Sequence, residues 1–287
     1  MPASFQQQPD LAPALFNLLD LVFPGLAAGA AAIRQLGASW EDVSTPFVVC
    51  ADGVVLSHVG LIELPLVLMG QPVAAGTLHA VATRPDHRGK GLFRRVMTEL
   101  LAHAASRHEI LVLTTEHPEY FTPFGFRHVP EHAFRLPCRH GGGGRSRRLD
   151  PAQAVDLALL HRLSTTRQPV SRVVGVGPQA AILLFNESRR PLWYVEELDA
   201  LLCLEHEGDL LRLFDVVAPK PPSWPALLAA LPWPVSMVEF NFAPDQFAPR
   251  AKPVARLLEH DGPSWLMVRG PWPPDGRPFT LPRSART

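Results

Sequence analysis

The chain has 287 residues, 47% apolar and 19% charged, so it can bury one large core or two smaller ones. Lysine plus arginine equals aspartate plus glutamate at 27 each, and this neutral balance argues against nucleic acid or an anionic membrane as partners. Cys50, Cys138 and Cys203 are far apart and lack CxxC spacing. We therefore expect neither a metal site nor a disulfide framework, and a reducing cytoplasmic location.

The N-terminal region predicts two helices, over residues 11–23 and 25–37. The most apolar stretch, residues 15–33, is interrupted by Asp20 and Pro24, and no basic residue precedes it. These features are atypical of a signal peptide or a membrane span. Two amphipathic helices that meet near Pro24 account for the pattern.

A series of strands and one helix is predicted up to residue 136. Asp52 and Gly53 form a two-residue hairpin signal between two apolar segments. A helix is expected from about Lys90 onward. Apolar residues recur there at spacings of three and four, while Arg94 and Arg95 fall on the other face. The expected strands cover residues 47–50, 54–68, 73–83, 110–114 and 126–136.

A glycine-rich segment, residues 141–149, divides the chain. Four consecutive glycines are followed by three arginines, a composition typical of a solvated, flexible joint. We therefore expect domains at 1–140 and 150–287 with this segment as the linker.

The second half is predicted to repeat the first in element order: two helices, three strands, a helix and a strand. The helices are expected at 150–164, 178–188 and 224–231, and the strands at 192–195, 201–206, 210–217 and 235–242. A short echo supports the repeat. The sequence PEYF follows the fourth strand of the first half, and PDQF follows its counterpart in the second.

The strongest functional signal is the sequence VATRPDHRGKGLF at residues 81–93. It takes a strand through a glycine-bearing turn into a helix. The N–H groups and the dipole of a helix start favour an anion, and Gly89 and Gly91 let the backbone approach phosphate oxygens. Arg88 and Lys90 add positive charge. An ordinary helix start with solvated basic residues is the alternative interpretation.

Residues 81–93 resemble the acetyl-CoA motif of the GNAT acetyltransferases, which often reads V-x-V-x-P-x-x-R-G-x-G. Residues 120–126, YFTPFGF, are similar to the late aromatic segment of that family. The resemblance covers about residues 11–137. The repeated element order resembles the tandem acetyltransferase domains of the enhanced-intracellular-survival type, without their additional C-terminal domain.

This resemblance implies an α+β (α/β) GNAT fold, a mixed and mostly antiparallel sheet flanked by helices, followed by a degenerate GNAT-like domain. It also implies acetyl-CoA as co-substrate, without a metal. The pantetheine arm would pair with the strand at Val81, Ala82 and Thr83. The pyrophosphate would lie on Arg88, Gly89, Lys90, Gly91, Leu92 and Phe93.

The catalytic residues are less closely defined. Asp86 stands where the family often has glutamine or arginine, and we expect its carboxylate to point away from phosphate. The family position of the general-acid tyrosine holds Phe121, so Tyr120 is the candidate acid, with water as the alternative. His79 and Glu116 are the candidate bases. For all three candidates a structural or solvated role stays open.

The second half lacks a counterpart of the glycine loop, because Pro219, Pro221 and Pro222 remove three backbone donors. We expect it to bind no acetyl-CoA and to shape the acceptor cleft. The leading hypothesis is an N-acetyltransferase that acts on a primary amine of a small molecule or peptide. An inactive acyl-CoA-binding sensor or scaffold, or a purely structural protein, are the alternatives.

Overall fold

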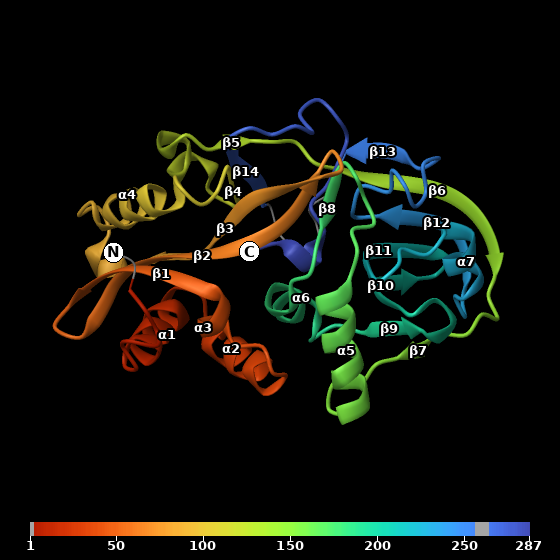
Figure 1. Ribbon diagram of the computed structural model, residues 1–287, viewed down its shortest axis with the longest axis horizontal. Helices are drawn as coiled ribbons and strands as arrows, with labels where there is room; N and C mark the ends of the chain where they lie inside the picture. Colours follow the sequence, from red (N-terminus) through yellow and green to blue (C-terminus); the bar gives the residue numbers. More distant parts are fainter. Residues whose placement is uncertain (1–2, 256–263) are drawn as a thin grey trace.

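The computed structural model describes residues 3–255 and 264–287, which form two mixed seven-stranded sheets with helices around them (Figure 1). This architecture confirms the expected α+β class. The first sheet has the strand order β1-β2-β3-β4-β14-β5, with β8 paired to β2. Its strands are β1 (Ser44–Ala51), β2 (Val54–Leu68), β3 (Gln71–Thr83), β4 (Ile110–Thr115), β5 (Arg127–His128), β8 (Val174–Val176) and β14 (Trp265–Arg269).

Helices cover both faces of the first sheet. On one face Leu78 of β3 packs in a cluster with Val96, which belongs to α4 (Leu92–Ala104). On the other face Ala82 packs with Leu15, which belongs to α1 (Leu11–Val22). The α1 face also carries α2 (Leu26–Gln35) and α3 (Trp40–Val43). None of the helices in the described ranges has the length and apolar character needed to cross a bilayer.

The second sheet has the strand order β13-β6-β12-β11-β10-β9-β7. Its strands are β6 (His132–Gly141), β7 (Arg147–Arg148), β9 (Leu192–Val195), β10 (Ala200–Glu207), β11 (Leu210–Val217), β12 (Pro234–Phe240) and β13 (Lys252–Ala255). The helices of this half are α5 (Ala154–Thr166), α6 (Ala180–Glu187) and α7 (Trp224–Ala229).

The two sheets repeat one strand order and exchange one strand. β1 to β4 correspond to β9 to β12, and in both sheets the third and fourth strands are parallel and joined by a crossover helix, α4 or α7. The next position is filled by an antiparallel strand from the other half of the chain, β14 beside β4 and β6 beside β12. Each half therefore completes the sheet of the other.

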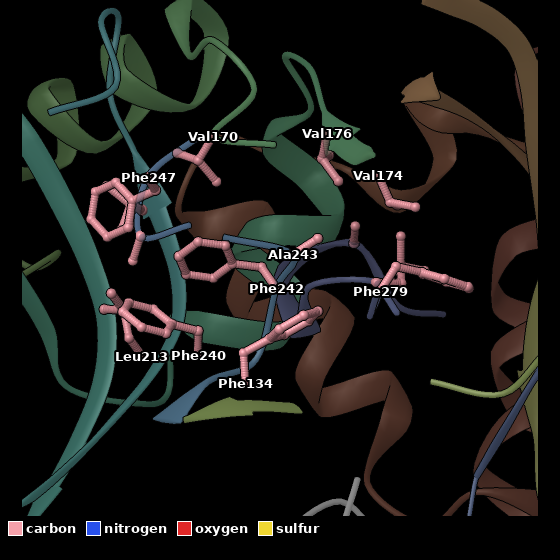
Figure 2. Close-up of a cluster of buried hydrophobic side chains, with 14 of the residues drawn as sticks. Phe134, Val170, Val174, Val176, Leu213, Phe240, Phe242, Ala243, Phe247 and Phe279 are labelled. Carbon is pink, nitrogen blue, oxygen red and sulfur yellow. The ribbon is translucent and has the colours of Figure 1, made fainter. Parts of the chain in front are cut away.

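A continuous apolar core lies between the two sheets. It contains Leu66 of β2 together with Leu213 of β11 and Phe240 of β12. Figure 2 shows Phe134, Phe240 and Phe279 within this cluster, and all three are buried. Because one core takes side chains from both halves, the halves are packed as one unit.

The glycine-rich segment is partly exposed, as a solvated joint would be, but its backbone is hydrogen-bonded to the second half. The N–H groups of Gly143 and Gly144 donate to the carbonyls of Pro232 and Leu231, at 3.2 and 3.0 Å. A side chain at Gly144 would overlap the backbone of Ala230. Glycine is needed there for close backbone approach, and composition alone does not distinguish this need from flexibility.

The expected strand at 126–136 is divided between the sheets. Only β5 stays in the first sheet, whereas β6 crosses to the second. Conversely, β14 lies within the expected second domain by sequence and belongs to the first sheet. A boundary at the glycine-rich segment therefore does not separate the two sheets.

Most other predicted elements are confirmed within a few residues. The hairpin between β1 and β2 has positive φ at Asp52 (49°) and Gly53 (77°), as its sequence indicates. The sequence did not reveal the elements that are short or that pair only with distant residues. These are α3, β7, β8, β13 and β14.

Candidate active site

The candidate site is a cavity that opens where β3 and β4 part. The two parallel strands pair at three positions, the last being Thr77 with Val112. The residues that follow, 78–83 on β3 and 113–115 on β4, line a common cavity of about 1200 Å³. The edge of β3 that faces this cavity offers peptide groups to an extended ligand.

The loop between β3 and α4 borders one end of the cavity. Gly89 and Gly91 have φ of 74° and 76°, and a Cβ at either would meet no described residue within 4 Å apart from its chain neighbours. Conformation therefore requires glycine here, and the adjoining space is open. Gly91 directly precedes α4 and has no side chain to cap it, so the first N–H groups of the helix can donate to an anion.

The charged residues of this loop differ in their orientation. Arg88 lines the cavity, whereas the Lys90 ammonium donates to the carbonyl of Asp86 and lies outside the cavity lining. The Asp86 carboxylate contacts His87 and Arg84, each at 3.2 Å, and these contacts lower its pKa. Asp86 is therefore held by basic neighbours. The other predicted cofactor positions all line the cavity: Val81, Ala82, Thr83, Leu92 and Phe93.

A β-bulge in β3 lies beside the cavity. Pairing with β2 shifts by one residue between His79 and Ala82. Within the bulge Ala80 has φ 49°, a conformation that costs a non-glycine residue about 1–3 kcal/mol. The fully buried His58 ring donates its Nδ1–H to the Ala80 carbonyl at 2.8 Å. Burial lowers the pKa of His58 to about 4, so a neutral histidine holds the bulge.

His79 reaches the cavity from the α1 face of the sheet. Its cross-strand partner is Gly60, where any side chain would overlap the imidazole. Nε2 lies 2.8 Å from the Ser44 hydroxyl, and the ring packs against Trp40 at 4.5 Å. Burial, and to a lesser degree the nearby His58, hold the pKa of His79 well below its usual range.

Two adjacent residues of the late aromatic segment both line the cavity and differ in their exposure. Tyr120 lines the cavity, is 57% exposed and stacks on His117 at 5.1 Å. Phe121 is 4% exposed and packs edge-on against Phe93 of α4. Glu116, which follows β4, also lines the cavity. One cavity therefore brings together the candidate catalytic residues Tyr120, His79 and Glu116.

A family model matches the part of the chain that carries most of this cavity. Residues 7–129 match the family model described as an acetyltransferase (GNAT) domain. The matched range contains β1 to β4, α4, the glycine loop and the late aromatic segment. Residues 7–129 are therefore a GNAT acetyltransferase domain. None of the curated protein sequences matches it.

Several solved structures share the GNAT fold over most of the chain. A conserved protein from Enterococcus faecalis has a TM-score of 0.61 at 14% identity, covering 94% of this chain and 71% of that one. A GCN5-related N-acetyltransferase from Kribbella flavida has 0.57 at 15%, covering 93% and 69%. Eis1 from Mycobacterium abscessus has 0.54 at 14%, covering 89% and 70%. At these identities the likeness concerns the fold.

The second half of the chain supplies one wall of the cavity. Ile182 and Phe185 of α6 line it, and the Phe185 ring lies 5.5 Å from that of Trp40 on α3. Figure 1 shows α6 beside α2, so the wall joins the two halves. Sequence reasoning missed these residues because their apolar periodicity is that of any buried helix.

The segment 283–287 reaches the same cavity. The Thr287 hydroxyl lies 2.5 Å from the Thr77 hydroxyl of β3 and donates to the Leu78 carbonyl at 2.9 Å. The Thr114 hydroxyl of β4 donates to the Thr287 carbonyl. This residue therefore bridges the two strands at the point where they part. No motif in the sequence marks this contact.

Proposed function

We propose that this acyltransferase transfers the acetyl group of acetyl-CoA to a primary amine. The observation that carries the proposal is the cavity at the parting of β3 and β4, with the glycine loop at one end. A parted pair of strands suits the extended pantetheine arm, and an uncapped helix start suits a pyrophosphate.

In the proposed complex the pantetheine arm lies along β3. The peptide groups of Val81, Ala82 and Thr83 pair with its amides as a neighbouring strand would. The first N–H groups of α4 hold the pyrophosphate, and Arg88 adds its positive charge. Lys90, which lies outside the cavity lining, contributes positive potential at the entrance.

The proposed reaction is a direct displacement. The amine nitrogen attacks the carbonyl carbon of the thioester, the new C–N bond forms, and the C–S bond breaks. The products are the N-acetylated amine and CoA. The nitrogen loses one proton and the thiolate sulfur gains one, so a base and an acid both accelerate the reaction.

Three cavity residues are assigned to these proton transfers. His79 lines the cavity and is proposed as the base because of this position; burial depresses its pKa, so the ring is neutral at physiological pH and a weak base. Glu116 at the end of β4 is the alternative base, acting directly or through a water molecule. Tyr120 is the proposed acid, because it is the residue of the late segment that combines a hydroxyl with a place in the cavity lining.

An acyl-CoA-binding protein without catalytic activity is the second candidate. It is favoured by the buried, hydroxyl-free side chain of Phe121 at the family's acid position and by the 57% exposure of Tyr120. The test combines calorimetry of acetyl-CoA binding with a thiol assay of CoA release over a panel of primary amines. Binding with turnover supports the transferase. Binding without turnover supports the second candidate, and failure to bind overturns both.

We also propose that the halves are an active GNAT domain and a degenerate copy, working in the reducing cytoplasm without nucleic acid or membrane partners. The repeated strand order supports the first point. The proposed location and the exclusion of nucleic acid and membrane partners rest on the neutral charge balance and on cysteines that form no disulfide within the described structure.

A further inference from the structure

The acceptor end of the cavity has an apolar wall. It lies on the face of the first sheet that α1, α2 and α3 cover, and α6 closes it from the other half of the chain. Residues from these helices and from the chain between them supply the wall: Phe23, Ile33, Trp40, Val43, Ile182 and Phe185. A wall of this kind stabilises an apolar ligand by removing its surface from water.

Trp40 is at the centre of an aromatic row along this wall. Its ring lies 5.5 Å from Phe185, 6.3 Å from Phe16 and 4.5 Å from His79. The row therefore runs from α1 through α3 to the imidazole of His79, the proposed base. A ligand ring in contact with Trp40 and Phe185 would have its neighbouring amine close to His79.

The charged groups at this end are basic and already paired. Arg283 forms a bidentate pair with the buried carboxylate of Glu187, at 2.8 and 2.9 Å, and Arg286 pairs with Glu131. Arg190 also lines the cavity. Among the described residues that line it, Glu116 is the only acid, and it follows β4.

The acidic residues next to Trp40 face elsewhere. Glu41 and Asp42 of α3 line a separate hollow of about 540 Å³, together with Pro9 and Ala12 near the N-terminus. Trp40 and Val43 of the same short helix line the acceptor end. α3 therefore turns its apolar side chains to the substrate and its carboxylates away from it.

We infer that the acceptor is a primary amine on an aromatic or branched aliphatic body, with no second cationic group. This inference rests on the proposed amine transfer. One ammonium can be accommodated beside His79 and Glu116, where it must lose a proton to react. A second would be buried against apolar side chains and paired arginines, where removal from water is not offset by a carboxylate.

The test measures CoA release by the full chain at saturating acetyl-CoA. The acceptors are 2-phenylethylamine, 1,5-diaminopentane and spermidine. We expect kcat/KM for 2-phenylethylamine to exceed that of either polyamine at least tenfold. Phe185→Asp adds a carboxylate to the wall and should narrow or reverse this ratio, while the matched control Phe185→Leu keeps the preference for the apolar amine.

Phe23→Asp provides a second carboxylate variant at a position that is 37% exposed, so its folding does not depend on core packing. Its matched control is Phe23→Leu. A polyamine preference in the unaltered chain would overturn the inferred acceptor class while leaving amine transfer intact. An unchanged ratio in both aspartate variants would also overturn it. If acetyl-CoA binds and no amine reacts, the proposed function itself fails, and the acceptor class with it.

Discussion

The two parallel crossovers occupy equivalent places in their sheets and differ in what they offer a ligand. Between β3 and α4 stand Gly89 and Gly91, and the helix begins without a capping side chain. Between β11 and α7 stand three prolines, and the Ser223 hydroxyl accepts the N–H of Ala226 at the helix start. The second helix therefore satisfies with its own side chain a donor that the first leaves available.

The gap beside the crossover strand also differs. In the first sheet it is the 1200 Å³ cavity. In the second, protein fills the equivalent region: Asp215 of β11 is fully buried and receives two hydrogen bonds from Arg167, at 2.8 and 2.9 Å, and one from Ser284. A repeated sheet can therefore keep its strand order while both its loop and its gap become unsuited to a ligand.

The largest effect is expected when the two halves of the chain are separated. A fragment of residues 1–140 lacks β14 and β8, so it exposes the edges of β4 and of the second part of β2. We expect this fragment to aggregate or to lose all transfer activity, because long unpaired apolar edges associate. Size-exclusion chromatography and the CoA-release assay measure both effects. A monomeric, fully active fragment would contradict the account of strand exchange.

A negative charge placed in each crossover loop tests which of the two loops binds the pyrophosphate. Gly91→Glu puts a carboxylate and a strained left-handed residue at the proposed pyrophosphate site. We expect acetyl-CoA affinity to fall at least ~100-fold, about 2.7 kcal/mol, by calorimetry. Lys220→Glu places a carboxylate in the second crossover and changes the charge there by two units rather than one, yet it should leave acetyl-CoA affinity unaltered. Equal affinities in the two variants would exclude the first loop as the phosphate site.

Removing the Tyr120 hydroxyl has a smaller expected effect. A general acid typically contributes ~10²–10⁴-fold to rate, and solvent can replace part of it at this exposed position. Tyr120→Phe should lower kcat at least ~10-fold and leave acetyl-CoA affinity unchanged. If the variant turns over as fast as the parent, Tyr120 is only a stacking partner of His117 and the thiolate takes its proton from water.

The last expected effect concerns the free energy of unfolding, and it distinguishes the β-bulge in the first sheet from the one in the second. His58 has a pKa of about 4 when folded and ~6.5 when unfolded, so below pH ~6.5 the unfolded chain binds the proton first. The free energy of unfolding should fall by up to about 3 kcal/mol between pH ~6.5 and ~4 from this group. The bulge between β10 and β11 lies beside the buried Cys203, which does not titrate in that range.

His58→Asn keeps an N–H donor near the Ala80 carbonyl and removes the titration. Urea unfolding at several pH values should therefore show a shallower loss of stability on acidification in this variant. An equally steep dependence in both proteins would mean that other groups cause the acid sensitivity.

The sequence predicted local structure well because local patterns carry it. The limits of β2 and the hairpin at Asp52 and Gly53 follow from alternation and turn chemistry alone. The assignment of β6 and β14 to their sheets does not, since both strands pair with residues about a hundred or more positions away. The glycine-rich segment was misjudged for the same reason: the backbone of Ala230, which requires Gly144, is distant in sequence.

The candidate site also has a part that the sequence predicts and a part that it does not. The glycine loop is contiguous, so its motif and its geometry could both be expected from residues 81–93. The acceptor wall could not, because Trp40, Phe185 and Thr287 meet only after both halves have packed. His58 was also missed, since a histidine within an apolar strand gives no sign of its hydrogen bond to the Ala80 carbonyl on the neighbouring strand.

The exchange of β6 and β14 also has a consequence for the order of events during synthesis. Residues 44–115 leave the ribosome early, yet β4 gains its outer neighbour only when residues 265–269 have followed. A nascent chain therefore carries the complete glycine loop long before the sheet around it closes, and it displays an open edge in the interval. A chain arrested in this interval would be a target for chaperones and proteases, so the supply of working enzyme depends on elongation through the second half.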